Sequence, residues 1–231
     1  AEYSVLSGAT ILRVSNQRFA RAANLISPYE PVFDPTLFGR QGKIMDSWET
    51  ARHNPQDHDE LDLKLAAPAR IRYVFLSTRF HDGNQAPTVR LLARRAQDSD
   101  WEELLPRTTM VGHGRIHIDL GGPHGPFIAI RVQMFPDGGL TRLGLYGELP
   151  DDLPDDLARA FVPLPQATAQ RYPDAVPASR KPLTLPYQPT AAEIAENIRR
   201  TPPAEIDWAY ATYGRCSRRS RRPSADRIAE N

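Results

Sequence analysis

The chain is poor in cysteine and in long hydrophobic runs. Its 231 residues include one cysteine, Cys216, so no disulfide can form within the chain and a disulfide-stabilised scaffold is excluded. A lone cysteine fits a reducing compartment, and we expect a cytoplasmic location. No apolar run approaches the roughly twenty residues of a membrane span, and the N-terminus lacks the basic and apolar segments of a signal peptide. We therefore expect no membrane association.

Net charge is also low. The formal net charge is +1, so no overall field attracts nucleic acid or an acidic membrane, and we expect neither as a partner. Five arginines lie between Arg215 and Arg222, and we interpret them as a solvated basic tail because no basic domain precedes them. A content of 40% hydrophobic and 25% charged residues is typical of a globular protein that buries a core.

Proline, in contrast, is abundant, and the apolar pattern is that of β-strands. The 22 prolines favour loops and turns, because proline is disfavoured inside helices and central strands. Short apolar or alternating segments between them predict strands at residues 9–14, 61–65, 71–77, 89–93, 101–105, 116–120, 127–135 and 140–146. This pattern predicts an all-β sandwich or barrel. The turn Pro136-Asp137-Gly138-Gly139 predicts a hairpin between the last two strands, since glycine adopts positive φ at little cost.

The composition changes after Gly147 and divides the chain into two parts. Residues 151–156 are acidic and interrupted by proline, and residues 161–189 hold seven prolines without periodicity. Such composition is typical of an extended or disordered segment. Residues 190–193 form a capping box that predicts one short helix. We expect a β domain over residues 1–150 and a proline-rich C-terminal extension over residues 151–231.

Ionisable side chains concentrate in residues 42–59. A structural turn needs few of them, whereas this stretch carries Lys43, Asp46, Glu49, Arg52, His53, His58 and Asp59, together with Trp48. Further motifs follow downstream: Gly83-Asn84, and the Pro136-Asp137-Gly138-Gly139 turn with Arg142 and Gly147 after it.

The order and rough spacing of these motifs resemble those of the allantoicase family. The resemblance includes the block Gly42-Lys43-Ile44-Met45-Asp46-Ser47-Trp48-Glu49-Thr50 and the pair His58-Asp59. It implies a jelly-roll β-sandwich, related to galactose-binding-like folds, over residues 1 to about 150. It also implies a hydrolase of purine catabolism that acts on linear amidines and ureides, releases urea from allantoate and needs no cofactor. Members of the family carry two copies of this domain, whereas one is recognisable here, so we expect a homodimer.

The chemistry of urea release needs a general acid, a base and a cation for the substrate carboxylate. We assign catalysis to Asp46, Glu49, His58 and Asp59. We assign substrate binding to Lys43, Trp48, Arg52, His81, Asn84 and Arg142. On this interpretation, replacing Asp46 or Glu49 by alanine lowers activity and changes stability little. The alternative for each is structural: loop caps, ion pairs, a core tryptophan or, for Asp137, the turn itself. His113, His117 and His124 fit no strong ligand signature, and we expect no metal site.

The chain also departs from the family pattern. Asn16 and Gln17 stand in place of an aspartate-glutamate pair. The other departures are Ser47 for a glycine, Ala51 for an arginine, Glu60 for an aromatic residue, Ser77 for an aspartate and Phe80 for a histidine or tyrosine. Neutral amides lose the acid-base capacity of carboxylates, which favours a changed substrate. Two alternatives therefore stay open: the same fold catalysing another small-molecule reaction, such as a cyclisation or carbon-nitrogen step in specialised metabolism, or a non-catalytic small-molecule or carbohydrate-binding module.

Overall fold

The computed structural model describes residues 3–29, 31–39 and 42–161. The short helix predicted at residues 190–193 and the basic end of the chain lie outside the described residues. No helix in the described part is long and apolar enough to cross a membrane.

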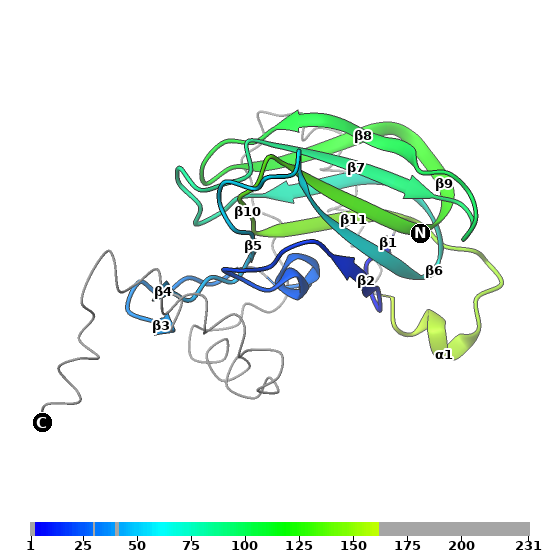
Figure 1. The fold of residues 1–231 in the computed structure, drawn as a ribbon. Helices are drawn as coiled ribbons and strands as arrows, with labels where there is room; N and C mark the ends of the chain where they lie inside the picture. The colour runs from blue at the N-terminus through cyan, green and yellow to red at the C-terminus, as the bar shows by residue number, and fades with distance from the viewer. Residues whose placement is uncertain (1–2, 30, 40–41, 162–231) are drawn as a thin grey trace, which may run out of the picture.

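The described part of the chain consists mainly of β-strands (Figure 1), as the sequence predicts. The elements are, in order, β1 (Tyr3–Ser4), β2 (Thr10–Val14), the 3-10 helix η1 (Ala22–Ile26), β3 (Phe38–Gly39), β4 (Gly42–Lys43), β5 (Trp48–Glu49), β6 (Asp59–Ser77), β7 (Thr88–Arg94), β8 (Glu102–Thr109), β9 (Arg115–Phe135), β10 (Gly139–Leu140), β11 (Arg142–Glu148) and the helix α1 (Asp155–Ala158).

Strands β6 and β9 are each a single long strand, whereas the sequence predicts two strands in place of each. The sequence breaks at Pro68 in β6 and at residues 121–126 in β9, where glycine and proline alternate. In the structure these breaks are shifts in the register of the β6–β9 ladder, one of them between Lys64 and Ala69. The glycines and prolines therefore mark bulges and bends within continuous strands.

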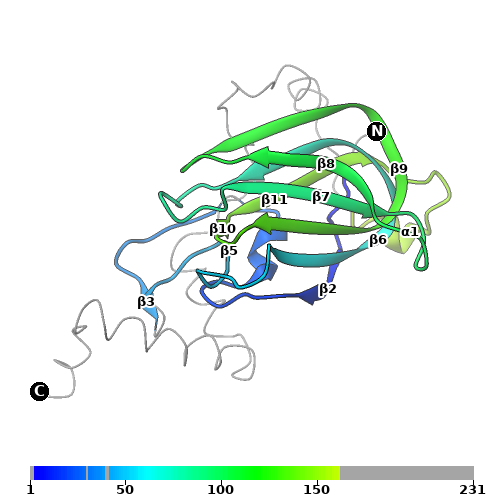
Figure 2. The same cartoon turned by 45° about the horizontal axis from the view of Figure 1, so that its top comes forward.

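The two long strands connect two layers of a jelly-roll β-sandwich. The first part of β6 pairs with β2 and with the end of β9, and β7 and β8 continue this layer. The second part of β6 pairs with the beginning of β9 and with β11, which in turn pairs with β1. Figure 1 shows β7 and β8 above β1 and β11, and Figure 2 shows the same strands with the top turned forward. The predicted jelly-roll fold is confirmed.

The predicted hairpin between the strands on either side of the glycine turn is wrong. After the turn, β10 pairs with β5 and β11 pairs with β6, with Leu143 opposite Leu76. In a hairpin, both strands belong to the same layer. Here the turn instead leads from β9 in one layer to β11, which pairs with the other half of β6.

The core lies between the layers. Alternate residues of several strands face inward and are buried: Leu61, Leu63 and Leu65 of β6, Val89 and Leu91 of β7, Ile130, Val132 and Met134 of β9, and Leu143 and Leu145 of β11. This alternation is the period-two pattern that predicts strands from the sequence. Phe161 is also buried, so the packed part of the chain continues beyond residue 150.

Replacing Gly147 by alanine tests the pairing of β11 with β6. A Cβ atom at Gly147 would lie 1.8 Å from the backbone oxygen of Arg70, which cannot rotate away. We expect the free energy of unfolding to fall by about 1–3 kcal/mol or more in urea denaturation. Gly121→Ala is the control, because Gly121 has open space around it and only its φ of +81° opposes a side chain, at about 1 kcal/mol. Equal losses in both variants would contradict the pairing.

Candidate functional site

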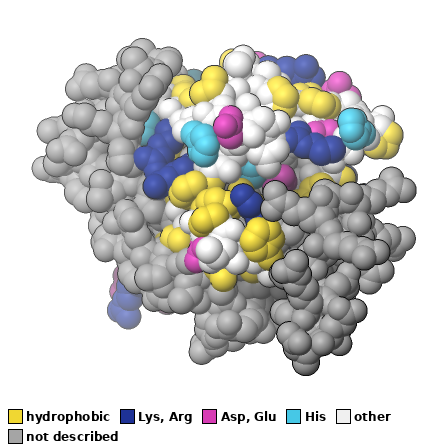
Figure 3. Space-filling view, turned by 90° about the vertical axis from the view of Figure 1, so that its left-hand side faces the viewer, with side chains coloured by type: hydrophobic (Ala, Val, Ile, Leu, Met, Phe, Trp, Pro, Cys, Tyr) yellow, Lys and Arg dark blue, Asp and Glu magenta, His cyan; other side chains and the backbone are white. Residues whose placement is uncertain are grey.

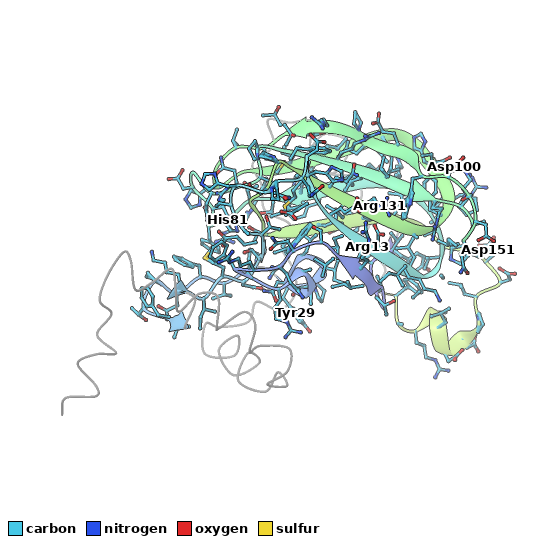
Figure 4. All side chains as sticks on the ribbon, in the orientation of Figure 1. Arg13, Tyr29, His81, Asp100, Arg131 and Asp151 are labelled. Atoms are coloured by element: carbon cyan, nitrogen blue, oxygen red, sulfur yellow. The ribbon has the colours of Figure 1, made fainter. Side chains whose placement is uncertain are left out.

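The charged stretch at residues 42–59 does not form one cluster. The structure places Asp46 in a buried ion pair with Arg142, and it places Glu49 and Arg52 in a separate cluster at the end of the sandwich. Figure 4 shows His81, a member of this second cluster, at the end where β5 and β10 meet. Figure 3 looks at this end, where histidine and charged side chains surround a hydrophobic area.

Asp46 and Arg142 connect the first loops of the chain to β11. The Nη2 atom of Arg142 donates to Oδ2 of Asp46 at 2.5 Å, and both side chains are at least nine-tenths buried. The Nε atom of Arg142 donates to the carbonyl of Tyr29, and Nη1 donates to carbonyls that include those of Asn24 and Asp46. Each guanidinium nitrogen therefore donates to protein oxygens, as in a framework contact.

Glu49 is the central carboxyl group of the second cluster. It lies on β5 opposite Gly139 of β10, and it is 8% exposed. Its Oε1 atom accepts a hydrogen bond of 2.9 Å from Nδ2 of Asn84, whose Oδ1 accepts from the amide of Asp82. Burial raises the pKa of Glu49, while Asn84 and the charge of Arg52 act in the opposite direction. A larger share of Glu49 is therefore protonated near neutral pH than of an exposed glutamate.

Arg52 lies beside Glu49 and is held by Asp137. Its Nη1 atom is 2.9 Å from Oδ1 of Asp137. The side chain of Arg52 is 34% exposed, whereas that of Asp137 is 7% exposed. The sequence favours a role in the turn itself for Asp137, and no pattern along the chain connects it with Arg52. The motif at residues 136–139 marked the position, but the contact joins residues 85 positions apart.

His81 lies directly against this cluster. It is fully buried, and neither ring nitrogen makes a hydrogen bond to the described residues. Its ring packs on the backbone of Gly139, where a Cβ atom would lie 2.2 Å from Cε1. Burial lowers the pKa of His81 to about 4, with Asn84 opposing and Arg52 and His113 adding to the decrease. His81 is therefore a neutral ring near neutral pH.

Backbone strain is found at the same end of the sandwich. In the described segments, the non-glycine residues with positive φ are His53, Phe80 and His113. His53 follows Arg52, Phe80 precedes His81, and the amide of His113 donates to the carbonyl of His81. Such strain costs about 1–3 kcal/mol per residue and clusters at functional sites. The strained positions support a functional role for this end.

The other residues assigned from the sequence lie elsewhere. Trp48 is fully buried, and its Nε1 donates to the carbonyl of Asn16 at 2.8 Å. Lys43 is exposed on β4, with Nζ 5.3 Å from the ring centre of Phe33. Asp59 is buried and accepts a hydrogen bond from Ser15. No described contact joins these side chains to Glu49.

His58 belongs to a polar network beside β6 and β9. Its Nε2 atom lies 3.2 Å from Glu60 and 2.9 Å from Gln133, and its ring packs on Phe135. Arg131 and Arg13, labelled in Figure 4, contact acidic side chains of this network. The network has no described contact with Glu49.

The amides at the departures from the family pattern have structural partners. Asn16 accepts hydrogen bonds from the amides of Arg18 and Ala51, and Gln17 accepts one from the amide of Ala22. An amide oxygen fills these positions as well as a carboxylate oxygen does. Their lost charge therefore changes the local electrostatics without removing these contacts.

Among the described residues there is no group of metal ligands, and a cavity lies apart from the Glu49 cluster. In the described part of the chain, no three histidine, cysteine, aspartate or glutamate side chains gather as metal ligands. A cavity of about 810 Å³ opens beside α1, lined by residues that include Tyr3, Arg70, Glu148 and Asp155. It shares no lining residue with the Glu49 cluster.

Comparison with known proteins gives consistent matches. The model described as the allantoicase repeat matches residues 3–150. "Probable allantoicase 2" of Burkholderia mallei is 35% identical over an alignment of 147 residues that covers 61% of this chain and 44% of that protein. "Allantoicase" of Saccharomyces cerevisiae is 32% identical over an alignment of 225 residues that covers 90% of this chain and 65% of that protein. The chain thus spans less than half the length of the Burkholderia relative.

Solved structures agree with the sequence matches. One described as "Structure of allantoicase" has a TM-score of 0.58 and 29% identity, and covers 65% of this chain and 50% of that chain. The crystal structure of allantoicase from Saccharomyces cerevisiae has a TM-score of 0.57 and 28% identity, and covers 65% of this chain and 49% of that chain.

Asp46→Asn tests the framework role of the buried ion pair. The change leaves the charge of Arg142 buried without its partner, and we expect a loss of roughly 3–5 kcal/mol in the free energy of unfolding. Glu102→Gln, which breaks the exposed Arg95–Glu102 pair, is the control and should cost about 0.5 kcal/mol or less. Normal stability with lost activity would instead support the catalytic role that the sequence suggested for Asp46.

The pH dependence of stability tests the burial of His81. The unfolded chain binds a proton as pH falls through 6.5, whereas folded His81 stays neutral until about pH 4, so acid favours unfolding in this window. We expect this effect to remove about 2–3 kcal/mol of stability between roughly pH 7 and 4.5, and to be absent in His81→Phe. The raised pKa of Glu49 has the opposite effect on stability as pH falls, and this effect is present in both the wild type and His81→Phe. Urea unfolding at the two pH values measures the difference, and an identical pH dependence in both would argue against the buried neutral ring.

Proposed function

Because the chain belongs to the allantoicase family, we propose that it cleaves a carbon-nitrogen bond of allantoate or a related ureido compound and releases urea. The observation that carries the proposal is the buried Glu49, held by Asn84 beside the partly exposed Arg52. The family supports an allantoicase-like hydrolase, and these three residues supply the polar groups that the reaction needs.

Glu49 is the general acid in this proposal. When the bond between the central carbon and the ureido nitrogen breaks, the electron pair leaves with the nitrogen, and Glu49 gives its proton to that nitrogen. A water molecule then adds to the carbon and returns a proton to Glu49, so that urea and the hydroxy acid are formed. Burial supports this role, because an acid works best when its pKa lies near the working pH.

Arg52 binds the substrate carboxylate in this proposal. Of its guanidinium nitrogens, Nη1 contacts Asp137, and the side chain is exposed enough to meet a small molecule. A guanidinium group binds a carboxylate through two parallel hydrogen bonds. The substrate would then lie with its carboxylate at Arg52 and its leaving ureido group at Glu49.

The alternatives from the sequence have less support from the geometry. A carbohydrate-binding module usually offers an exposed aromatic side chain beside its polar groups, whereas Trp48, the aromatic residue next to Glu49 on β5, is fully buried. Another carbon-nitrogen reaction in specialised metabolism would use the same acid and cation, so the substrate assay separates it from allantoate hydrolysis. The homodimer and the cytoplasmic location stay predictions.

The proposal is tested by urea release from allantoate by the purified chain. Glu49→Gln keeps the size of the side chain and an oxygen that accepts from Asn84, but it cannot donate the proton. We expect kcat to fall roughly a hundredfold or more while the unfolding transition stays close to that of the wild type. Glu103→Gln, on β8 and paired with Arg90, is the control and should keep wild-type activity. Full activity of Glu49→Gln would exclude Glu49 as the acid, and no urea release by the wild type would overturn the proposed reaction.

A further inference from the structure

Asp137 is buried in the turn before β10, and both of its carboxylate oxygens contact the segment that follows β5. Oδ1 lies 2.9 Å from Nη1 of Arg52, and Oδ2 accepts a hydrogen bond of 3.2 Å from the amide of Asn54. A carboxylate that only completes its own turn bonds to the backbone of that turn. Asp137 instead bonds to the loop that carries Arg52.

The turn cannot move independently of this loop. Gly138 donates to Oγ1 of Thr50, and the amide of Thr50 donates to the carbonyl of Gly138, both at 3.0 Å. On its other side, a Cβ atom at Gly138 would lie 2.6 Å from the amide nitrogen of Ala86, and the φ of +138° also favours glycine. Gly138 is thus enclosed between Thr50 and Ala86, which fixes the position of Asp137 beside it.

The contact with Asp137 leaves part of the guanidinium group of Arg52 available. The described residues provide one partner for Arg52, at Nη1, and the side chain is 34% exposed. The remaining donors point away from that contact, because a guanidinium group is rigid and planar. They can bind an anion without breaking the ion pair with Asp137.

We propose that Asp137 is a positioning residue: it orients Arg52 so that one part of the guanidinium group is held by the protein and the rest receives the carboxylate of an anionic substrate beside Glu49. The identity of that substrate rests on the proposed function, whereas the role of Asp137 rests on the contacts described above. The site then selects compounds with a carboxylate next to the carbon that loses its nitrogen, over neutral analogues of the same size.

Asp137 also affects Glu49 through the charge of Arg52. The charged or titratable groups of this cluster are Arg52, Asp137 behind it, and His81 from the loop before β7. Arg18 and Arg21 flank Ala20, whose backbone pairs with that of Glu49. The adjacent elements β10 and η1 carry none. Arg52 favours the ionised form of Glu49, and Asp137 partly compensates for that charge. Neutralising Asp137 therefore lowers the pKa of Glu49, whereas neutralising Arg52 raises it.

Asp137→Asn tests the proposal in the full chain, because asparagine keeps an oxygen for the amide of Asn54 but loses the charge that holds Arg52. We expect KM for allantoate to rise about tenfold and kcat at the optimal pH to change by less than about threefold. A general acid must be protonated, so activity falls as pH rises through the pKa of Glu49. This alkaline limb should move to lower pH in Asp137→Asn and to higher pH in Arg52→Gln. The control is Asp119→Asn, which removes a carboxylate on β9 that pairs with Arg72 of β6. It should change neither KM nor the pH of the alkaline limb.

A second measurement does not depend on the reaction. The carboxyl carbon of Glu49 is titrated by NMR in the full chain labelled with ¹³C-glutamate, and its assignment is confirmed by Glu49→Gln. We expect the midpoint to fall in Asp137→Asn and to rise in Arg52→Gln. If the wild type releases no urea but the midpoints shift in this way, the proposed reaction is wrong, and the coupling of Asp137 through Arg52 to Glu49 still supports the positioning role. If the midpoint is the same in Asp137→Asn and the wild type, the positioning role is wrong. If Asp137→Asn does not fold, an unchanged midpoint in Arg52→Gln overturns it.

Discussion

The continuous ladder between β6 and β9 is the constraint on which the rest of the structure depends. Both strands pass through the two layers, so the same pair of strands fixes the position of each layer. β2, β7 and β11 then add to free edges of this pair, and β8 pairs with β7. The inward-facing leucines, valines and isoleucines of both layers meet in one core, whose burial supplies the main stabilising free energy.

The candidate site lies where this framework ends. Strand β9 finishes at one end of the sandwich, and the turn that follows it meets the loops after β5 and β6. Backbone hydrogen bonds of Gly138 and Gly139 connect this turn to the two loops and form a rigid joint between them. Glu49, Asn84 and Arg52 are therefore fixed by segments far apart in the sequence. A rigid joint of this kind preserves the orientation of polar groups, which is a condition for electrostatic catalysis.

Two kinds of charged residue come from the same stretch of sequence. Asp46 is paired with an arginine whose nitrogens all donate to protein oxygens, whereas Glu49 has one neutral partner and a partly exposed cation nearby. The first arrangement is a framework contact that stabilises the fold. The second leaves the carboxyl group with a raised pKa, as a proton donor requires. Neighbouring positions in one stretch of sequence thus have different chemistry because their tertiary partners differ.

The sequence by itself determined the strand content, the jelly-roll fold through its family motifs, and the choice of Glu49, Arg52, Asn84 and His81 as candidate site residues. These follow from local alternation and from short motifs, which are readable along the chain. The tertiary structure alone decided that β6 and β9 are continuous, that β11 pairs with β6, and that Asp137 holds Arg52. It also separated Asp46 from Glu49, although the two lie three positions apart. Burial and pairing across the sandwich fix such partners, and no local pattern in the sequence records them.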